Sequence, residues 1–512
     1  MQATSYEDVQ YQSKPHYPMH ADSLGTLGRL FGMQPALASK CRVLELGCAT
    51  AMNIICMAEA LPESEFVGLD LSPSQIAAGQ QVVDAAGLKN IRLHAASIMD
   101  IDASWGKFDY ILCHGVFSWV PKIVQDKLFE ICRRLLTPQG IAYISYNTYP
   151  GWHQRKIVRE MMKYHSGPLT DLQEKIQQAR AIVKFMAKST PDQTTSYAKF
   201  LDSELKTLED APDSYVFHEH LEEVNSPLYF HEFHQRASEH GLQYVSEAWQ
   251  HLNLDELPKD VSESLQGISR DLIQLEQYAD FLTNRTFRRT LLCQAEVQLD
   301  RSPAVEVISQ LLVTALARPA SETPDVRSQA EEQFRLDTGG VVSVNFPIVK
   351  AALVRAYRAW PQMVPFEQLL AESLADIADD TTNREEQKAL LAMMLLRGHL
   401  THFVALHREP FEFCLTVNER PITSPLARTL AGQFAQVPTR RHISVGYSPA
   451  ERLLLVLADG TRTKAELLRD FAAIQTNDSA NAPELATGHN TELAKWIEMT
   501  LQQFGKQALL VG

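Results

Sequence analysis

The chain has 512 residues and a mass of 57.6 kDa, which is too long for one compact core, so we expect several domains. With 45% hydrophobic and 21% charged residues it is not a wholly disordered chain, and it has no apolar run long enough for membrane insertion. The net charge of −14 argues against nucleic acid as the main partner, because phosphate binding needs a basic surface.

The cysteines and the N-terminus bear on the location of the protein. The seven cysteines include no C-x-x-C pair, so we expect neither a disulfide framework nor a zinc ribbon. Residues 1–20 carry acids and no apolar segment, unlike a signal or transit peptide. A reducing, cytoplasmic location fits these features best.

Residues 41–151 alternate short apolar runs with helical patterns. The runs are rich in β-branched and aliphatic residues and are expected as buried strands at 41–47, 64–70, 90–97, 108–115 and 140–147. Between them the patterns predict helices at 53–60, 73–86 and 123–136, and a turn at 137–140. This alternation predicts an α/β fold with a doubly wound, Rossmann-like parallel sheet.

The rest of the chain is more helical. We expect residues 1–165 to form the core, a helix-plus-strand unit at 215–250 to complete it, and 166–214 to be a helical insertion. Residues 251–330 are expected as a helical middle region ending in a Pro- and Ser-rich linker at 318–332.

Two further domains are expected beyond the linker. A hairpin at 334–344, followed by helices and strands, predicts a small winged-helix-like α+β domain at 333–420. Its other expected elements are helices at 347–360, 365–377 and 384–397 and strands at 401–406 and 411–417. Residues 421–512 are expected as a C-terminal helical domain with a polar loop at 476–490.

The most informative stretch is VLELGCATAMN, residues 43–53. It places a strand, a tight turn of small residues (Gly47, Ala49, Ala51) and a helix start at Asn53, which brings backbone N–H groups against a ligand. Asp70 ends the next strand at an offset typical of an acid that binds ribose hydroxyls. The two features together indicate an adenosine-type cofactor.

The choice between NAD(H) and S-adenosylmethionine (SAM) depends on Glu45. A carboxylate just before the turn would repel a pyrophosphate, but it suits the cationic aminoacyl end of SAM. The motif resembles that of the class I SAM-dependent methyltransferases, with alanine at two of the glycine positions. The alternative is a degenerate nucleotide-binding fold in which Gly47 and Asp70 serve only as turn and cap.

The resemblance implies further cofactor-binding residues. Asp70 and the following Leu71 would hold the ribose side, Ser97 and Ile98 would lie beside adenine, and His114 would end the fourth strand in the site. The family often has an acidic residue at the position of Ser97, and Asp100 would make the adenine-side contact in its place. The N-terminal tyrosines are candidates for an arm that closes over the cofactor, or else they cap the core: Tyr6, Tyr11 and Tyr17, with His20.

A second resemblance covers most of the chain. HGVFSWVP (114–121), YISYNTYPGWH (143–153), HEHLEEVNSPLYFHEF (218–233) and FLTNRTFRRTLLC (281–293) resemble the methyltransferases with a methyltransferase regulatory domain. That group includes the rickettsial lysine methyltransferases of an outer-membrane protein. It implies a protein substrate, a cytoplasmic bacterial enzyme and a possible homodimer, with 251–330 in the regulatory region.

Aromatic and neutral polar residues follow the last two expected strands. Methyl transfer needs a neutral amine, and such residues favour loss of the lysine proton. Asn147 and Tyr149 would accept from the amine, while Trp119 and Trp152 would wall the channel or serve as core or lid residues. The other candidates here are Phe117 and His153, for which packing is the alternative to a general base.

Two other motifs invite a functional interpretation. The histidines at 218, 220, 231 and 234 match no closed metal-ligand set, so we expect no metal and consider the segment around Tyr215, Asn225 and Tyr229 as a lid. NRTFRR, residues 284–289, is expected as a solvated helix face or an interdomain ion-pair site.

The sequence therefore predicts a SAM-dependent methyltransferase that acts on a nitrogen, most favourably on a protein lysine. A small-molecule methyltransferase is the alternative enzyme, since a closed apolar pocket would suit it as an open cleft suits a polypeptide. A SAM-binding regulatory protein without turnover is the alternative from another class.

Overall fold

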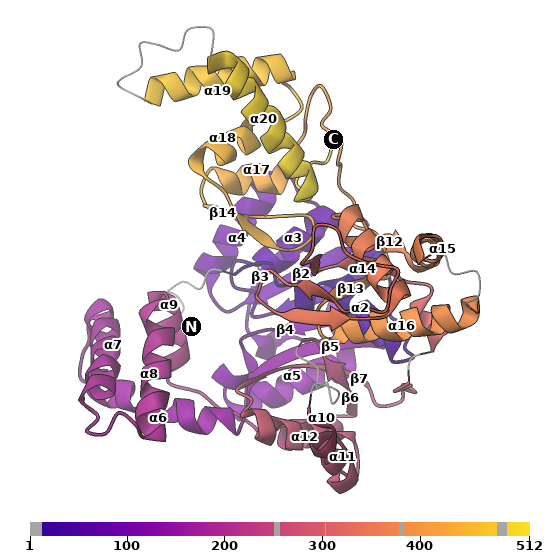
Figure 1. Cartoon of the computed structure of the whole chain (residues 1–512). Helices are drawn as coiled ribbons and strands as arrows, with labels where there is room; N and C mark the ends of the chain where they lie inside the picture. The colour runs from indigo at the N-terminus through magenta and orange to yellow at the C-terminus, as the bar shows by residue number, and fades with distance from the viewer. Residues whose placement is uncertain (1–12, 250–256, 303, 378–382, 479–488) are drawn as a thin grey trace.

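A seven-stranded sheet forms the centre of the molecule, and its strand order is β3-β2-β1-β4-β5-β7-β6. The computed structural model describes residues 13–249, 257–302, 304–377, 383–478 and 489–512 (Figure 1). β1 to β5 pair in parallel, and β7 runs antiparallel to both β5 and β6. The strands are β1 (Arg42–Leu46), β2 (Glu65–Asp70), β3 (Ile91–Ala95), β4 (Phe108–Cys113), β5 (Leu136–Asn147), β6 (Leu242–Glu247) and β7 (Phe287–Gln294).

Helices cover both faces of this sheet, as the alternating apolar patterns predict. One face packs against α2, α3 and α4 in a core that includes Leu24, Ile54 and Tyr143. The other face packs against α5 and α10 in a core that includes Leu128 and Phe233. The α/β, doubly wound architecture is confirmed. These helices are α2 (Ala21–Leu30), α3 (Met52–Ala60), α4 (Pro73–Ala86), α5 (Lys122–Leu135) and α10 (Phe230–Glu239).

Short turns complete this part of the chain. α4 begins at Pro73 after Ser72, whose hydroxyl accepts from the Gln75 amide, as the sequence predicts. The turn expected at 137–140 is wrong, because β5 starts directly after α5 and absorbs these residues in an irregular register. The 3-10 helices are η1 (Tyr17–Met19), η2 (Ala38–Lys40), η3 (Ile98–Asp100), η4 (Ala103–Trp105) and η5 (Phe117–Trp119).

The expectation of a helical middle region at 251–330 is wrong where the chain forms strands. Residues 260–283 lie in α11 (Lys259–Ile268) and α12 (Leu272–Thr283), but β7 follows and takes a place in the central sheet. The arginines of this segment look like an exposed helix face in sequence, yet Arg288 is fully buried among carboxylates. Because charged residues are rarely buried, the arginines did not indicate that this segment forms the buried strand β7. α13 (Val305–Ile308) and β8 (Leu312–Ala315) follow.

The helical insertion stands apart from the sheet, at the left of Figure 1. Its helices pack on one another through an apolar core of their own that includes Val158, Val183 and Leu201. A short π-helical segment then returns the chain towards the sheet. The elements are α6 (Gly151–Ser166), α7 (Leu172–Ser189), α8 (Ser196–Glu209), α9 (Asp213–Val216) and η6 (Phe217–Leu221).

The region after β8 forms a separate core of helices and small sheets. The hairpin expected at 334–344 is present, but residues 411–417 form no strand within the described chain. The buried pair of Asp22 in α2 and His407 in β13, 2.9 Å apart, joins this region to a helix that packs on the central sheet. Its elements are β9 (Arg318–Pro319), β10 (Glu332–Arg335), β11 (Val341–Val344), α14 (Pro347–Ala359), β12 (Val364–Pro365), α15 (Phe366–Ile377), α16 (Arg384–Leu400) and β13 (Val404–His407).

The C-terminal region packs against α3 and α4 (Figure 1). Leu426 and Leu430 belong to the same apolar core as α3, and Ser424 hydrogen-bonds the Glu59 carboxylate at 2.7 and 2.8 Å. Most of the polar loop expected at 476–490 lies outside the described residues. The elements are α17 (Pro425–Ala431), β14 (Gln436–Pro438), β15 (Ser444–Gly446), α18 (Pro449–Leu457), α19 (Lys464–Asp478) and α20 (His489–Lys506).

Two general features concern the chemistry of the chain. All seven cysteines are free, and six of them are buried. Among the described helices, none combines the length and the apolar character that a membrane span requires.

Candidate functional site

The turn after β1 has the backbone geometry of a ligand clamp. Gly47, Ala49 and Ala51 have φ angles of 70°, 50° and 58°, all in the left-handed region. An alanine there costs about 1–2 kcal/mol, and such strain concentrates at binding sites. Gly47 admits no side chain, because a Cβ would come within 2.4 Å of Val116 Cγ2. The loop after β4 thus lies directly against this turn.

Asp70 holds the turn from the end of β2. Its Oδ2 accepts from the Ala49 amide at 2.8 Å and its Oδ1 from the Ser72 amide at 2.9 Å. The next residue, Leu71, is 44% exposed although it is apolar. A carboxylate and an apolar side chain therefore meet the strained turn at the carboxyl edge of the sheet, where parallel α/β folds bind their ligands.

Glu45 is a buried carboxyl group with a free oxygen. Its Oε1 accepts from Asn53 Nδ2 at 3.2 Å, while Oε2 has no hydrogen-bond partner among the described residues. Burial raises the pKa of Glu45 to about 8, although hydrogen bonds from Asn53 and the Ile54 amide oppose the rise. A buried unpaired oxygen beside a strained turn fits the cationic amine that SAM carries.

The N-terminal segment closes over this turn. The Ser13 hydroxyl accepts from the Met52 amide at 2.9 Å and lies 2.9 Å from Thr50 Oγ1. The His16 amide donates to Asn53 Oδ1 at 3.1 Å, and the His16 ring lies 4.7 Å from the ring of His114. His114, predicted from the end of β4, therefore lies beside the same site as Asn53.

The remaining N-terminal candidates are placed differently. Tyr6 and Tyr11 lie outside the described residues. Tyr17 and His20 face the regions that follow in the chain, since the Tyr17 ring lies 6.4 Å from His407 and the His20 ring 5.2 Å from Phe411.

The end of β3 borders the site from the other side. Ser97 caps the η3 turn, and its amide donates to Asp100 Oδ2 at 3.2 Å. Asp100 is thus engaged within its own turn. Ser97 and Ile98 are half-buried at the end of a strand that pairs directly with β2, whose end carries Asp70.

Polar and aromatic side chains gather where β5 ends. Asn147 is buried and its Nδ2 lies 3.4 Å from Asn225 Oδ1. The Tyr149 ring stacks on the His153 ring at 4.0 Å and lies 5.2 Å from the Tyr229 ring. Asn225 and Tyr229, two of the three residues named for the lid, therefore lie against these candidates, while the Tyr215 hydroxyl accepts a hydrogen bond from Arg155 at 3.4 Å.

The two tryptophans predicted from this region pack against each other. Trp119 and Trp152 meet edge to face, with ring centroids 6.3 Å apart. The Arg159 guanidinium lies 5.9 Å from the Trp119 ring, and that of Arg155 lies 5.9 Å from the Trp152 ring. Trp152 is only 1% exposed, so its burial favours the packing alternative over a channel wall.

The structure adds residues that sequence patterns did not indicate. His16 and His442 both hydrogen-bond Asn53. Arg289, singled out in sequence only as part of the 284–289 motif, extends from β7 on the same face of the sheet as Tyr143. Burial and, secondarily, Arg289 lower the pKa of His16 to about 4, so this ring is neutral at physiological pH. Among the described residues, Arg289 Nε is buried without a hydrogen bond, and the guanidinium lies 5.1 Å from the Phe287 ring.

The arginines of 284–289 thus divide between two roles. Arg285 and Arg288 belong to a buried ion-pair network with Asp280 of α12, and Arg288 also pairs with Glu247 of β6. The helix-face alternative is wrong, and the ion pairs join neighbouring elements rather than two domains. For the histidine-rich segment, His218 bonds Glu222 at 3.1 Å, and His231 contacts Gln277 at 2.9 Å. Nowhere in the described part of the chain do three or more potential ligands come together to hold a metal ion.

Three family models match the chain. Residues 37–200 match "Methyltransferase domain", residues 212–294 match "Predicted methyltransferase regulatory domain", and residues 419–509 match "PKMT, C-terminal winged helix domain". The winged-helix match thus lies in the segment expected to be helical, 421–512, and not at 333–420.

Relatives extend over nearly the whole chain. An uncharacterized protein of Rickettsia prowazekii is 36% identical over 473 residues, which cover 90% of this chain and 84% of that protein. The solved structure of PKMT2 from Rickettsia typhi has a TM-score of 0.85 and 31% identity, covering 98% of this chain and 100% of its own. A second structure of PKMT2, with the same values, contains AdoHcy.

Proposed function

The chain belongs to the methyltransferase family that carries a methyltransferase regulatory domain and a PKMT-type C-terminal winged helix domain, and we propose that it methylates the side-chain nitrogen of lysine in a protein. It is a SAM-dependent enzyme. The main structural observation in support of SAM binding is the buried Oε2 of Glu45, which has no hydrogen-bond partner among the described residues and lies beside the strained turn. The full-length similarity to PKMT2, and the resemblance to lysine methyltransferases, support the acceptor.

The cofactor-binding residues are proposed from their places around the turn. Glu45 takes the cationic amine, and Asn53 orients Glu45 through their 3.2 Å hydrogen bond. Asp70 accepts from the ribose hydroxyls, while Leu71 and Ile98 cover the adenine from the ends of β2 and β3. Further residues proposed for the binding surface are Gly47, Ala49, Ala51, Ser97 and His114. Tyr11, which lies outside the described residues, is proposed from the sequence alone.

Catalysis requires an aligned, neutral lysine amine, because bound SAM supplies an electrophilic methyl group that a protonated amine cannot attack. Asn147 and Tyr149 are proposed to accept hydrogen bonds from that amine at the end of β5. Burial raises the pKa of Tyr149, so it stays an uncharged phenol. Trp119 is proposed to border the acceptor channel, with Trp152 supporting it from behind.

The proton on Glu45 predicts a pH dependence of cofactor affinity. With a pKa of about 8, the free protein holds Glu45 mostly protonated at neutral pH, whereas a cationic amine needs the carboxylate. SAM affinity should therefore rise about tenfold between pH 6.5 and pH 8, with a proton released on binding below pH 8.

Calorimetric titration in two buffers of different ionisation enthalpy measures this proton release. Glu45→Gln is the matched control, because it keeps the shape and removes the titration. A proton count of zero in the wild type, or an unchanged pH dependence in Glu45→Gln, would contradict the assignment.

The acceptor is tested by incubating the enzyme with methyl-labelled SAM and a lysate of its source cell. Acid-stable label on a protein, mapped to lysine by mass spectrometry, is the expected result. Label among small molecules alone would make it a small-molecule methyltransferase, and binding without transfer would make it a SAM-binding regulatory protein. Asn147→Ala and Tyr149→Phe should lose about 100-fold in rate while still binding AdoHcy.

Partners and location extend this proposal. We propose a homodimer formed through the helical insertion, where apolar side chains are exposed: Tyr164, Phe185, Met186 and Tyr197. The acidic net charge of −14 supports a protein partner over nucleic acid, and seven free cysteines support a cytoplasmic location.

Domain limits are proposed as well. The catalytic core comprises residues 1–150 with 222–250 and β7, and the helical insertion comprises 151–221, wider than the expected 166–214, because its apolar core includes Val158 in α6 and Leu221 in η6. A middle region follows, and the winged helix domain begins near residue 419.

A further inference from the structure

A turn of the C-terminal domain, residues 439–442, reaches the cofactor side of the central sheet. His442 Nε2 donates to Asn53 Oδ1 at 2.8 Å, across 389 residues of sequence. His442 is 2% exposed and has a left-handed φ of 60°. A left-handed φ is energetically unfavourable for residues other than glycine, so contacts with the surrounding structure must stabilise His442 in this conformation.

The neighbours of His442 fix this turn from several sides. The Arg440 guanidinium donates to the carbonyls of Glu412, at 2.6 Å, and Ala60, at 3.3 Å. The Arg441 guanidinium lies 4.0 Å from the Trp360 ring and donates to the Pro361 carbonyl at 2.5 Å. The turn is therefore held between α3 and the segment that follows α14, which keeps His442 beside Asn53.

His442 determines which end of the Asn53 amide meets Glu45. Asn53 Oδ1 accepts from two donors, His442 Nε2 and the His16 amide, so Nδ2 is left to bond Glu45 Oε1. Once Glu45 is ionised, as a cationic ligand requires, reversing the amide would place two acceptors, Oδ1 and the carboxylate, against each other. With Oε1 engaged in this way, Oε2 stays buried without a hydrogen-bond partner among the described residues.

The chemistry of His442 suits this place. Burial, together with His20 and His16, lowers the pKa of His442 well below its ordinary value, so the ring donates without carrying a charge. An arginine or lysine in its place would set a cation beside the site that receives the cationic amine of SAM.

We propose that His442 is a positioning residue of the SAM site, so that the C-terminal winged helix domain completes that site. This inference rests on the proposed function only in taking SAM as the ligand. It gives the C-terminal domain a role in cofactor binding: the domain orients Asn53, Asn53 orients Glu45, and Glu45 receives the aminoacyl end. By linkage, cofactor and docked domain stabilise each other.

The test compares His442→Leu with His442→Gln in the full chain. Both variants carry the same backbone strain, but the glutamine Nε2 can donate where the histidine Nε2 does. Binding is measured by calorimetry with AdoHcy and with 5′-methylthioadenosine, which lacks the amino and carboxylate groups. His442→Leu should weaken AdoHcy about tenfold and leave methylthioadenosine within about twofold, and His442→Gln should restore AdoHcy binding.

Ser424→Ala provides the matched control. Ser424 joins the same domain to α3 through the Glu59 carboxylate, at 2.7 and 2.8 Å, without contacting Asn53. Its AdoHcy affinity should stay within about twofold of the wild type. Equal losses for both ligands, a loss in Ser424→Ala as large as in His442→Leu, or no loss in His442→Leu would overturn the inference. A wild type that binds no AdoHcy would instead contradict the proposed function.

Discussion

Replacing Asp70 with alanine is expected to weaken SAM binding by about 100-fold or more. The substitution removes the proposed acceptor for both ribose hydroxyls, and hydrogen bonds to a charged group contribute about 1.5–3 kcal/mol each. It also removes the 2.8 Å bond to the Ala49 amide, which holds the strained turn in place. The dissociation constants of SAM and AdoHcy, measured by calorimetry, check this result.

Asp102→Asn is the control for the loss of a surface carboxylate that does not contact the turn after β1. Asp102 accepts from the Ser104 amide at 2.9 Å at the start of a surface turn. Its removal should leave SAM affinity within about twofold of the wild type. Comparable losses in Asp102→Asn and Asp70→Ala would contradict the place given to the ribose.

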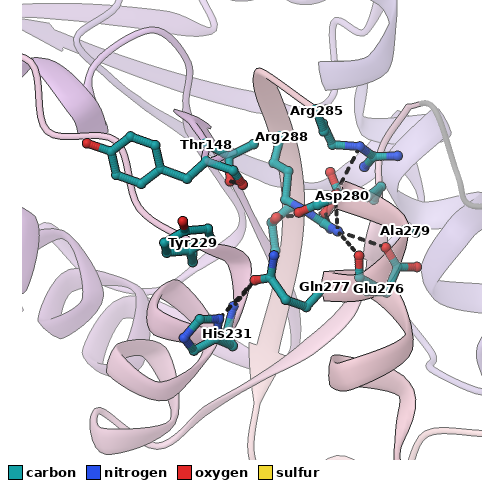
Figure 2. A network of polar contacts seen from close by, with 12 residues as sticks. Thr148, Tyr229, His231, Glu276, Gln277, Ala279, Asp280, Arg285 and Arg288 are labelled. Atoms are coloured by element: carbon teal, nitrogen blue, oxygen red, sulfur yellow. Dashed lines mark hydrogen bonds and ion pairs between the residues drawn. The ribbon is translucent and has the colours of Figure 1, made fainter. Parts of the chain in front are cut away.

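Replacing Arg288 with methionine is expected to destabilise the sheet by about 3–5 kcal/mol. Figure 2 shows the guanidinium between the carboxylates of α12, and it bonds Asp280 at 2.8 Å, Glu276 at 3.0 Å and Glu247 at 2.8 Å. The ring of Phe230 lies 3.8 Å from it. Methionine would leave three acidic groups facing one another without their shared cation.

Hydrogen exchange of the β7 amides measures this loss where it arises. Arg134→Met is the surface control, because its pair with Glu130 is exposed on a helix and contributes at most about 0.5 kcal/mol. Adding Asp280→Asn to Arg288→Met should recover part of the stability, since burial raises the pKa of Asp280 to about 6 even beside the arginines. Unchanged β7 exchange in Arg288→Met would contradict a structural role for the network.

The central sheet could be predicted because its strands obey local rules. β1 to β5 are apolar runs bounded by turns, and α4 begins at a serine cap followed by proline. β7 escaped prediction because its arginine run signals an exposed surface, and only the carboxylates of β6 and α12 explain its burial. Such pairing depends on the fold, and sequence spacing does not reveal it.

The cofactor-binding part of the site could also be predicted only in part. Glu45, Gly47 and Asp70 carry a motif with a physical meaning, so their proximity follows from the parallel sheet. His16 and His442 follow from no motif, because they reach Asn53 from segments distant in the chain. The left-handed φ of His442 is a local indication that this residue is functionally constrained, but a backbone angle can be read only from the structure.

The accessory domains show the limit of composition and periodicity. Residues 333–420 and 421–512 both contain helices with short strands, so the pattern alone did not indicate which part matches the winged helix. The role proposed for the C-terminal domain likewise depends on its packing against α3, through Leu426 and Leu430, and on one buried hydrogen bond.

A crystal structure of the full chain with AdoHcy tests the account most directly. We expect the amine at Glu45 Oε2, the ribose hydroxyls at Asp70, the adenine between Leu71 and Ile98, and His442 still bonded to Asn53. AdoHcy bound with its amine away from Glu45, or with the residue 439–442 turn withdrawn from Asn53, would contradict it.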